Sequence, residues 1–182
     1  MRPPRVRASI LATLAVSLLL GVAFVVVGKL HPPAADSLDH PANPVTDEQS
    51  QAQVVEPAKQ IVSLAALQTR SAGYLLMSCK DRNDPPYQGA IYLTFAVPSD
   101  VGADTYFPAI TTKLVGHGWV EGLAPKDHTF GSTVSKDAVT AIIYRDSDHH
   151  DLGVLRIYGE CRNMNDHHHE GWTDIAAQLT PN

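Results

Sequence analysis

The sequence of 182 residues predicts an α+β domain behind a single hydrophobic N-terminal segment. Two observations indicate this fold class. Segments with alternating apolar residues, which is the pattern of strands, follow one another through short polar turns. Two segments with apolar residues at helical spacing lie among them. We therefore expect a two-layer sandwich, in which an antiparallel sheet of about five strands carries helices on one face.

The first half of the domain predicts one helix and two strands. Thr46 followed by Gln49 forms a capping box, and apolar residues at helical spacing then predict a helix over residues 47–69. Pro57 should either kink this helix or start a second one. Residues 73–79 predict a strand that is apolar on both faces, and residues 91–97 predict a second, alternating strand. A polar loop over residues 80–89 joins them.

The second half begins with a helix predicted over residues 104–116, in which Pro108 falls near the first turn. Gly116 and Gly118 resemble a glycine loop, but they follow a helix instead of opening one. They therefore predict a helix end before a packed Trp119. Strands near residues 131–136, 138–145 and 152–160 form an antiparallel meander, with turns at 136–137 and 146–151, and a short last helix fits residues 172–179.

Residues 8–28 set the predicted location. They carry no charge, and 16 of the 21 are Ala, Val, Ile, Leu or Phe, which is long enough for a helix to span a bilayer. Arg2, Arg5 and Arg7 precede the segment and favour a cytoplasmic N-terminus. We expect residues 1–7 to be a cytoplasmic tail, 8–28 a transmembrane signal-anchor helix, 29–45 a proline-rich linker and 46–182 an extracytoplasmic domain.

A cleaved signal peptide is the alternative to this anchor. Its apolar region usually has about 7–15 residues and ends in a box of small residues, whereas residues 29–33 here are Lys, Leu, His and two prolines. No cysteine directly follows the apolar run, so the sequence does not predict a lipoprotein anchor. A buried helix of a globular domain would show a polar face, which this segment lacks.

Charge and motifs exclude several function classes. Three of the 14 basic residues precede the apolar segment, so the remainder has 11 basic and 19 acidic residues, a net charge of −8. So acidic a domain is a poor candidate for binding nucleic acid or anionic lipid. The sequence contains no nucleophile elbow, phosphate-binding loop or dinucleotide fingerprint. No spacing selects Glu121, Asp127 or His128 as acid–base groups, so we predict no enzyme and rank a hydrolase third.

Cys79 and Cys161 are the only cysteines, and in an exported domain they predict one disulfide. Side chains alternate between the two faces of a strand, so Cys79 shares a face with Leu75 and Met77, and Cys161 shares a face with Ile157. Both faces are apolar, and we expect them to face the core. A disulfide fits if those two strands are neighbours. The alternative is two free, buried thiols.

Five of the nine histidines lie in two short runs, residues 146–151 and 165–170. Imidazole and carboxylate groups are good ligands for Zn, Cu or Ni. The last long strand separates the runs, so each would bind metal separately. The alternatives are solvated polar loops or a pH sensor. The candidate ligands are His149, His150, His167, His169, Asp148 and Asp166.

The loop between the first two strands holds two further candidates. Residues 81–84 offer oxygen ligands, but they lack the glycine and distal glutamate of an EF-hand, so we expect a solvated turn rather than a calcium site. The extended segment Asp84, Pro85, Pro86 and Tyr87 is a candidate partner-docking loop. The alternative is that Tyr87 packs back onto the domain.

Three stretches together resemble small exported proteins and lipoproteins of mycobacteria and related actinobacteria, whose function is unknown. They are residues 78–87 (SCKDRNDPPY), Gly118–Trp119, and residues 159–162 (GECR) with Asp166–His167. The resemblance implies an envelope location and supports the pairing of Cys79 with Cys161, but this sequence lacks the cysteine that carries the lipid.

From this we predict a binding or interaction domain of the bacterial cell envelope, with an unknown protein or small-molecule partner. A metal-binding protein that uses the histidine runs is the alternative.

Overall fold

The computed structural model describes residues 38–80 and 84–179, and the compact unit that begins at Pro41 contains every element discussed below. The predicted cytoplasmic tail, transmembrane segment and first part of the linker lie outside the described residues. Among those described, no helix is both long enough and apolar enough to cross a membrane.

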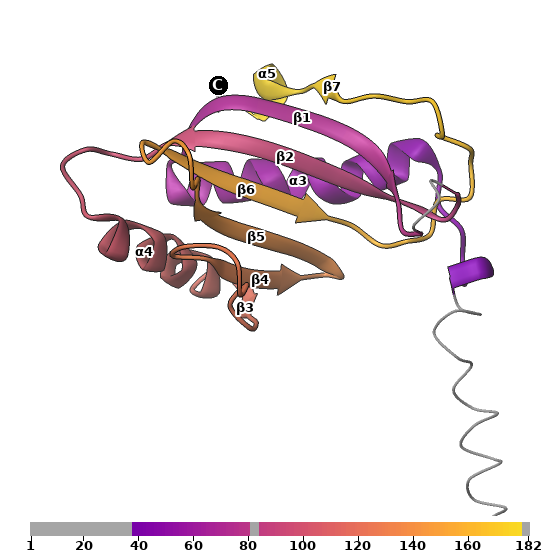
Figure 1. Cartoon of the computed structure of the whole chain (residues 1–182). Helices are drawn as coiled ribbons and strands as arrows, with labels where there is room; N and C mark the ends of the chain where they lie inside the picture. The colour runs from indigo at the N-terminus through magenta and orange to yellow at the C-terminus, as the bar shows by residue number, and fades with distance from the viewer. Residues whose placement is uncertain (1–37, 81–83, 180–182) are drawn as a thin grey trace, which may run out of the picture. The chain divides into compact units, whose positions relative to one another are not determined.

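The domain is built on a seven-stranded antiparallel sheet in the order β3-β4-β5-β6-β2-β1-β7 (Figure 1). This confirms the α+β class and the predicted meander, which is β4-β5-β6. The expected count of about five strands is wrong, because two-residue strands, too short to show alternation, extend the sheet at both edges. The strands are β1 (Gln68–Ser78), β2 (Tyr87–Ala96), β3 (Val120–Glu121), β4 (Ser132–Lys136), β5 (Val139–Arg145), β6 (Leu152–Tyr158) and β7 (Thr173–Asp174).

One face of the sheet is covered by the long helix α3 (Asp47–Ala65), which contacts β1, β2, β5 and β6. Helix α4 (Ala103–Val115) packs against α3, β4 and β5, and the short α5 (Ala176–Leu179) packs against α3 and β1. The large side chains between these layers are fully buried, and each stabilises the fold by about 1.5–3 kcal/mol. They include Ile61, Phe107, Leu114, Ile91, Leu93, Phe95, Ile143, Leu155 and Ile157.

Helix α3 begins with the predicted capping box. The Thr46 hydroxyl accepts from the Gln49 amide at 3.2 Å, and the Gln49 side chain accepts from the Thr46 amide at 3.0 Å. The helix is continuous through Pro57, so the possible second start there is wrong. It ends at residue 65 rather than 69, because Ala66 is left-handed (φ 53°) and Leu67 donates back to the Val62 carbonyl.

The C-terminal segment differs from its prediction. A helix was expected over residues 172–179, but Thr173 and Asp174 instead pair with β1 at the edge of the sheet. The Asp174 carboxylate then accepts the Ala176 amide at 2.9 Å, and only the turn from residue 176 to 179 is helical. Pairing with an open sheet edge satisfies backbone groups that a short isolated helix would leave exposed.

The side chains of β1 alternate in the opposite sense to the prediction. Leu76 is buried and lies opposite Gly89, which touches α3, so Leu75 and Met77 are on the face away from the helices. The expectation that they face the core is wrong. Because β1 is apolar at consecutive positions, its alternation carries no signal for which face is inside.

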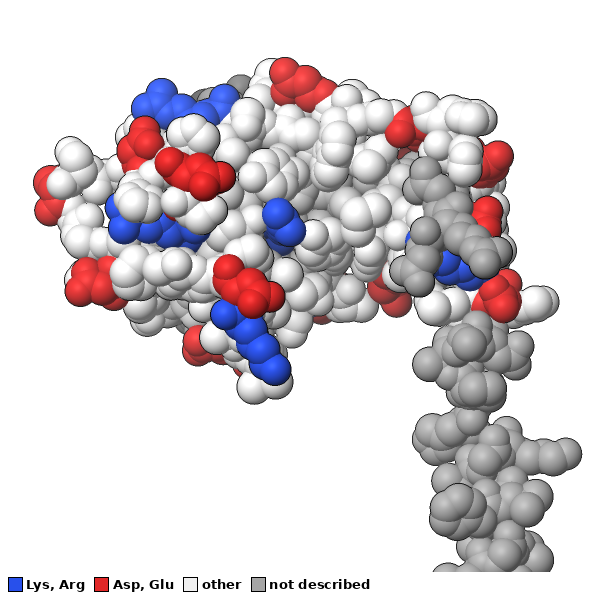
Figure 2. All heavy atoms as spheres, viewed as in Figure 1, with Lys and Arg blue, Asp and Glu red and all other residues white. Residues whose placement is uncertain are grey.

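The face away from the helices is the one in view in Figures 1 and 2. Figure 2 shows mainly uncharged atoms over the sheet, with acidic and basic side chains concentrated toward the margins. The guanidinium carbon of Arg156 lies 5.5 Å from the ring centroids of both Tyr92 and Tyr144, and His128 stacks on Tyr144 with centroids 3.8 Å apart. Cation–π and stacking contacts thus order side chains that none of the described helices covers.

Gly89 allows α3 to approach β2 closely. A Cβ atom there would overlap the Ser50 carbonyl oxygen and lie 3.0 Å from Val54. We predict that Gly89→Ala lowers the free energy of unfolding by about 1–3 kcal/mol, the range for overpacking. Gly171→Ala is the control, because a Cβ there meets nothing within 4 Å. Equal denaturation midpoints for the two variants would contradict this account of the helix contact.

Candidate functional site

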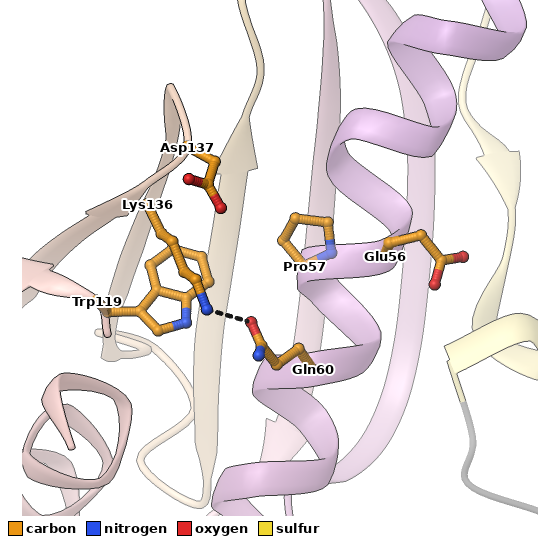
Figure 3. A pocket seen from close by; sticks show the side chains of 6 residues that line it. All are labelled: Glu56, Pro57, Gln60, Trp119, Lys136 and Asp137. Carbon is orange, nitrogen blue, oxygen red and sulfur yellow. Dashed lines mark hydrogen bonds between the residues drawn. The ribbon is translucent and has the colours of Figure 1, made fainter. Parts of the chain in front are cut away.

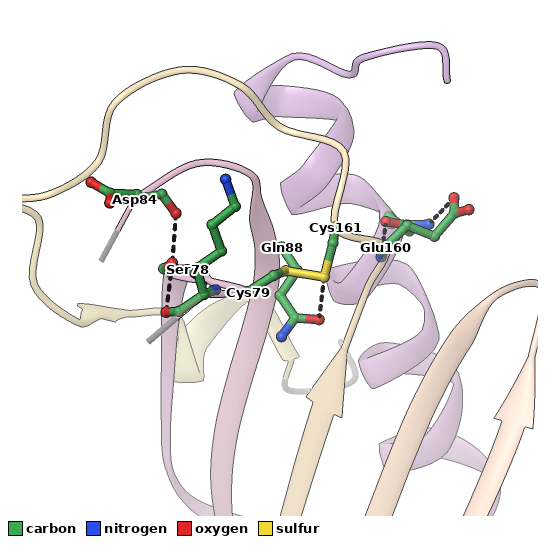
Figure 4. Close-up of a disulfide and its surroundings, with 8 residues drawn as sticks. Ser78, Cys79, Asp84, Gln88, Glu160 and Cys161 are labelled. Atoms are coloured by element: carbon green, nitrogen blue, oxygen red, sulfur yellow. Dashed lines mark hydrogen bonds between the residues drawn. A yellow bond between two sulfur atoms is a disulfide. The ribbon is translucent and has the colours of Figure 1, made fainter. Parts of the chain in front are cut away.

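A disulfide joins Cys79 to Cys161, with Cα atoms 6.0 Å apart (Figure 4). The predicted pairing is confirmed, but the strands are not neighbours, because β2 lies between β1 and β6. Each cysteine lies beyond the end of its strand, so the bridge passes over the start of β2. Gln88 lies beneath it, with its side-chain oxygen 3.7 Å from the Cys161 sulfur.

The candidate docking loop is mostly packed against the domain. Asp84 is exposed, but Pro86 and Tyr87 are buried, and Tyr87 meets the His167 ring edge-on with centroids 5.2 Å apart. Ser78 ties the two sides of the loop by donating to the Asp84 carbonyl at 2.6 Å. A partner at this loop remains a prediction, and the aromatic ring would not be available to it. Residues 81–83, which we expect to form a solvated turn with Asp84, lie outside the described residues.

The first histidine run forms the turn between β5 and β6. Asp146 organises it by accepting the amides of His149 at 2.8 Å and Asp148 at 2.9 Å. The hydrogen bond from the His149 amide is the main cause that lowers the pKa of Asp146. The His149 and His150 side chains are exposed at this turn, at the opposite end of β6 from the second run.

The second run divides into a buried and an exposed part. His167 is 5% exposed, with Nε2 3.1 Å from the Asp47 carboxylate. Its Nδ1 is 2.8 Å from a Glu170 oxygen, at an angle outside hydrogen-bonding geometry. His168 and His169 are exposed, with ring centroids 4.9 Å apart.

The predicted metal ligands are not gathered into one cluster. In the part of the chain that the structure describes, no three His, Cys, Asp or Glu side chains lie together as a metal ion requires. Asp166 accepts the His168 amide at 2.9 Å and so helps to shape the loop. Metal binding by either run therefore stays a prediction.

The Asp47 carboxylate connects the start of α3 to the loop that follows β6. One of its oxygens accepts from the side chains of Asn163 at 2.8 Å, Asn165 at 2.8 Å and His167 at 3.1 Å. Asn163 is fully buried, and its hydrogen bond is the main cause that lowers the pKa of Asp47. The sequence showed the adjacent capping box but gave no sign of this contact, which spans 116 residues.

A cavity of about 320 Å³ opens between the middle of α3, the β4–β5 turn and the segment after α4 (Figure 3). Helix α3 supplies one wall and the turn supplies the opposite one. Trp119 completes the lining between them. The lining residues are Glu56, Pro57, Gln60, Trp119, Lys136 and Asp137.

Trp119 is fixed by the end of α4. Its amide donates to the Leu114 carbonyl and the Gly118 amide to Val115, each at 3.1 Å, with Gly118 at φ +87°. This is a Schellman motif, and it turns the indole inward until 2% of the residue is exposed. The predicted helix end before a packed Trp119 is confirmed. Among the described residues, none accepts a hydrogen bond from the buried indole nitrogen.

Lys136 is held beside this indole. Its ammonium donates to the His117 carbonyl at 3.1 Å and to the Gln60 side chain at 3.5 Å (Figure 3). Asp137 and Ala138, with φ of 49° and 64°, form the tight turn that follows. The sequence predicted this turn and a packed Trp119 separately. Nothing in it indicated that they meet residues of α3.

Comparison with known proteins places the chain in a family. The model of the family described as "Putative lipoprotein LppJ" matches residues 46–178. The chain belongs to this family. "Putative lipoprotein LppJ" of Mycobacterium tuberculosis, strain ATCC 25618 / H37Rv, is 41% identical over 174 residues, which cover 95% of this chain and 91% of the relative. The same values hold for the protein of that name in strain CDC 1551 / Oshkosh and in Mycobacterium bovis. No solved structure matches the chain.

Membership confirms the resemblance to mycobacterial exported proteins and lipoproteins. The matched region contains both cysteines, Asp47 and every residue that lines the Trp119 cavity.

Asp47 offers a test with a matched control. We predict that Asp47→Ala lowers the free energy of unfolding by about 1–2 kcal/mol near neutral pH, a value reduced because the carboxylate is 44% exposed. Glu48→Ala removes a neighbouring charge from the same helix turn, and it should lower the free energy of unfolding much less.

The effect of Asp47 should also depend on pH with a defined sign. Folding lowers its pKa from the ordinary 3.8, so the stabilisation is complete above that value and is lost as the pH falls through the lower, folded-state pKa. Denaturant unfolding at several pH values should therefore show that the difference in free energy of unfolding between wild type and Asp47→Ala becomes smaller below about pH 4. A gap of constant size down to pH 2 would contradict the lowered pKa.

The disulfide closes a sequence separation of 82 residues. We expect reduction, or the Cys79→Ser/Cys161→Ser double variant, to lower the free energy of unfolding by about 4 kcal/mol in the chain-entropy account. Denaturant unfolding with and without a reductant measures this, and the reductant should not affect the double variant. An unchanged midpoint for the reduced wild type would refute a stabilising role.

Proposed function

We propose that this protein is a membrane-anchored, extracytoplasmic binding module of the cell envelope, and that the Trp119 cavity is its binding site. The observation that carries the proposal is the buried indole N–H. A buried tryptophan normally finds an acceptor, and here, among the described residues, none is present. A ligand oxygen would satisfy it.

The composition of the cavity favours binding over catalysis. Its ionisable side chains are Glu56, Lys136 and Asp137, and its lining includes no serine, cysteine or histidine that could form a nucleophile–base pair. Two other surface hollows, of about 320 and 280 Å³, are lined by described side chains whose buried polar atoms all have partners. The Trp119 cavity is therefore the stronger candidate.

The proposed anchor is the uncharged segment of residues 8–28, retained as a single membrane-spanning helix with the N-terminus in the cytoplasm. The relatives carry the name "Putative lipoprotein LppJ", and a lipoprotein is attached through a lipid on a cysteine. In this sequence no cysteine precedes Cys79, and Cys79 is bonded to Cys161. A retained helix would give the same attachment without a lipid. The disulfide supports an oxidising compartment outside the cytoplasm.

Membrane fractionation tests this proposal. We expect the full chain, expressed in a mycobacterial host, to stay in the membrane pellet after alkaline washing and to incorporate no alkynyl fatty acid. Replacing Leu18, Leu19 and Leu20 by Asp should release the protein from the pellet or block export, because each buried charge opposes insertion. A mature N-terminus near residue 35, or fatty-acid labelling of the chain, would overturn the anchor.

A further inference from the structure

The Trp119 cavity has donors at one end and a carboxylate at the other. We infer that it binds a small zwitterion, an amino acid or a short peptide, with the ligand carboxylate at Trp119 and Lys136 and the ligand ammonium at Asp137. The inference rests on the proposed binding function and names the class of ligand.

The donor end is formed by two side chains held by backbone contacts. Figure 3 shows the indole nitrogen of Trp119 on the side of the ring that faces Lys136 and Gln60. The ammonium of Lys136 stands over Gly118, 3.1 Å from the His117 carbonyl. An indole N–H and an ammonium both donate, so the group that complements them is an acceptor, and a carboxylate gains from the positive charge as well.

The opposite end is acidic. Asp137 is exposed on the tight turn, and Figure 3 shows its carboxylate directed toward the space between the turn and Pro57. Glu56 points away from that space and is 2.9 Å from Lys59. A simple anion would be repelled by Asp137 and by the net charge of −8 that the chain carries beyond its apolar segment. A ligand that also has an ammonium group turns the repulsion at Asp137 into attraction.

The middle of the cavity is apolar and limited in size. The Pro57 ring and the face of Trp119 lie between the two charged ends, and the volume of about 320 Å³ suits a ligand with a short aliphatic body. The indole nitrogen is covered in the structure. Entry of a carboxylate therefore requires a side chain beside the ring to move, and Figure 3 shows the long flexible stem of Lys136 next to it.

The test uses the full chain in detergent micelles with Trp172→Phe, which leaves Trp119 as the only tryptophan. The probe is L-alanyl-L-alanine, followed by Trp119 fluorescence, and compared with its C-terminal amide and its N-acetyl derivative. We expect a saturable change with the dipeptide. Binding should weaken about tenfold for the amide, which loses the carboxylate, and several-fold for the N-acetyl form, which loses the ammonium.

The chain supplies a matched pair of variants. Lys136→Gln and Asp137→Asn remove the two charges of the cavity, and asparagine tolerates the left-handed conformation at position 137. Lys126→Gln and Asp127→Asn remove the same two residue types from an exposed loop. Only the first pair should weaken dipeptide binding.

Two outcomes would overturn the inference. Equal binding of the dipeptide, its amide and its N-acetyl form would show a binding module that does not recognise a zwitterion, and the proposed function would stand. If Trp119 fluorescence does not change with alanine or alanyl-alanine at millimolar concentration, both the zwitterionic ligand and the Trp119 cavity as a binding site are refuted. Membrane fractionation tests the anchor independently of either result.

Discussion

The Asp47 carboxylate fixes the first residue of α3, and the other layers of the domain are arranged around that helix. Three side chains from the loop after β6 converge on one carboxylate oxygen. The same loop carries Cys161, so the disulfide and the Asp47 contacts hold one segment at different residues. A charged acceptor that satisfies a fully buried asparagine is expensive to remove, because the amide would be left without a partner of equal strength.

The position of the cavity follows from the position of the helix. About three turns after Asp47, the same helix presents Pro57 and Gln60 to the β4–β5 turn, while the Glu56 side chain points away from it. The close contact at Gly89 sets the distance of α3 from the sheet. The Schellman motif after α4 then brings Trp119 into the remaining gap. The helices and the turn that line the site are thus each fixed at one end by hydrogen bonds, so the movement that a small ligand requires is confined to side chains.

Much of the architecture could be predicted because local signals agree with it. The Thr46 capping box, the glycines after α4 and the alternation in β2 each have a local physical cause. Other features lacked a local signal. Ala66 ends α3 in a conformation that glycine usually adopts, and a two-residue strand such as β3 or β7 depends wholly on its neighbour. Residues 74–77 of β1 are apolar on both faces, so the core side could not be read from them.

The candidate site was harder still to foresee. His167 stood out in the sequence as a metal ligand, yet the fold buries it against Asp47, 120 residues away. Lys136 and Gln60 are 76 residues apart and meet only because the sheet and α3 are stacked. Residue type suggested chemistry in the histidine runs, whereas Trp119 combines a buried, unpartnered donor with a place in the lining of a cavity.

The most direct test of a ligand at Trp119 is the indole Nε1–Hε1 resonance. It would be followed in the ¹H–¹⁵N spectrum of the full-length protein with Trp172→Phe, during titration with L-alanyl-L-alanine. We predict that the free protein shows a resonance typical of an indole without a strong acceptor. On saturation it should move downfield, as the N–H donates to the carboxylate. A resonance that stays in place while the dipeptide is in excess would contradict the account.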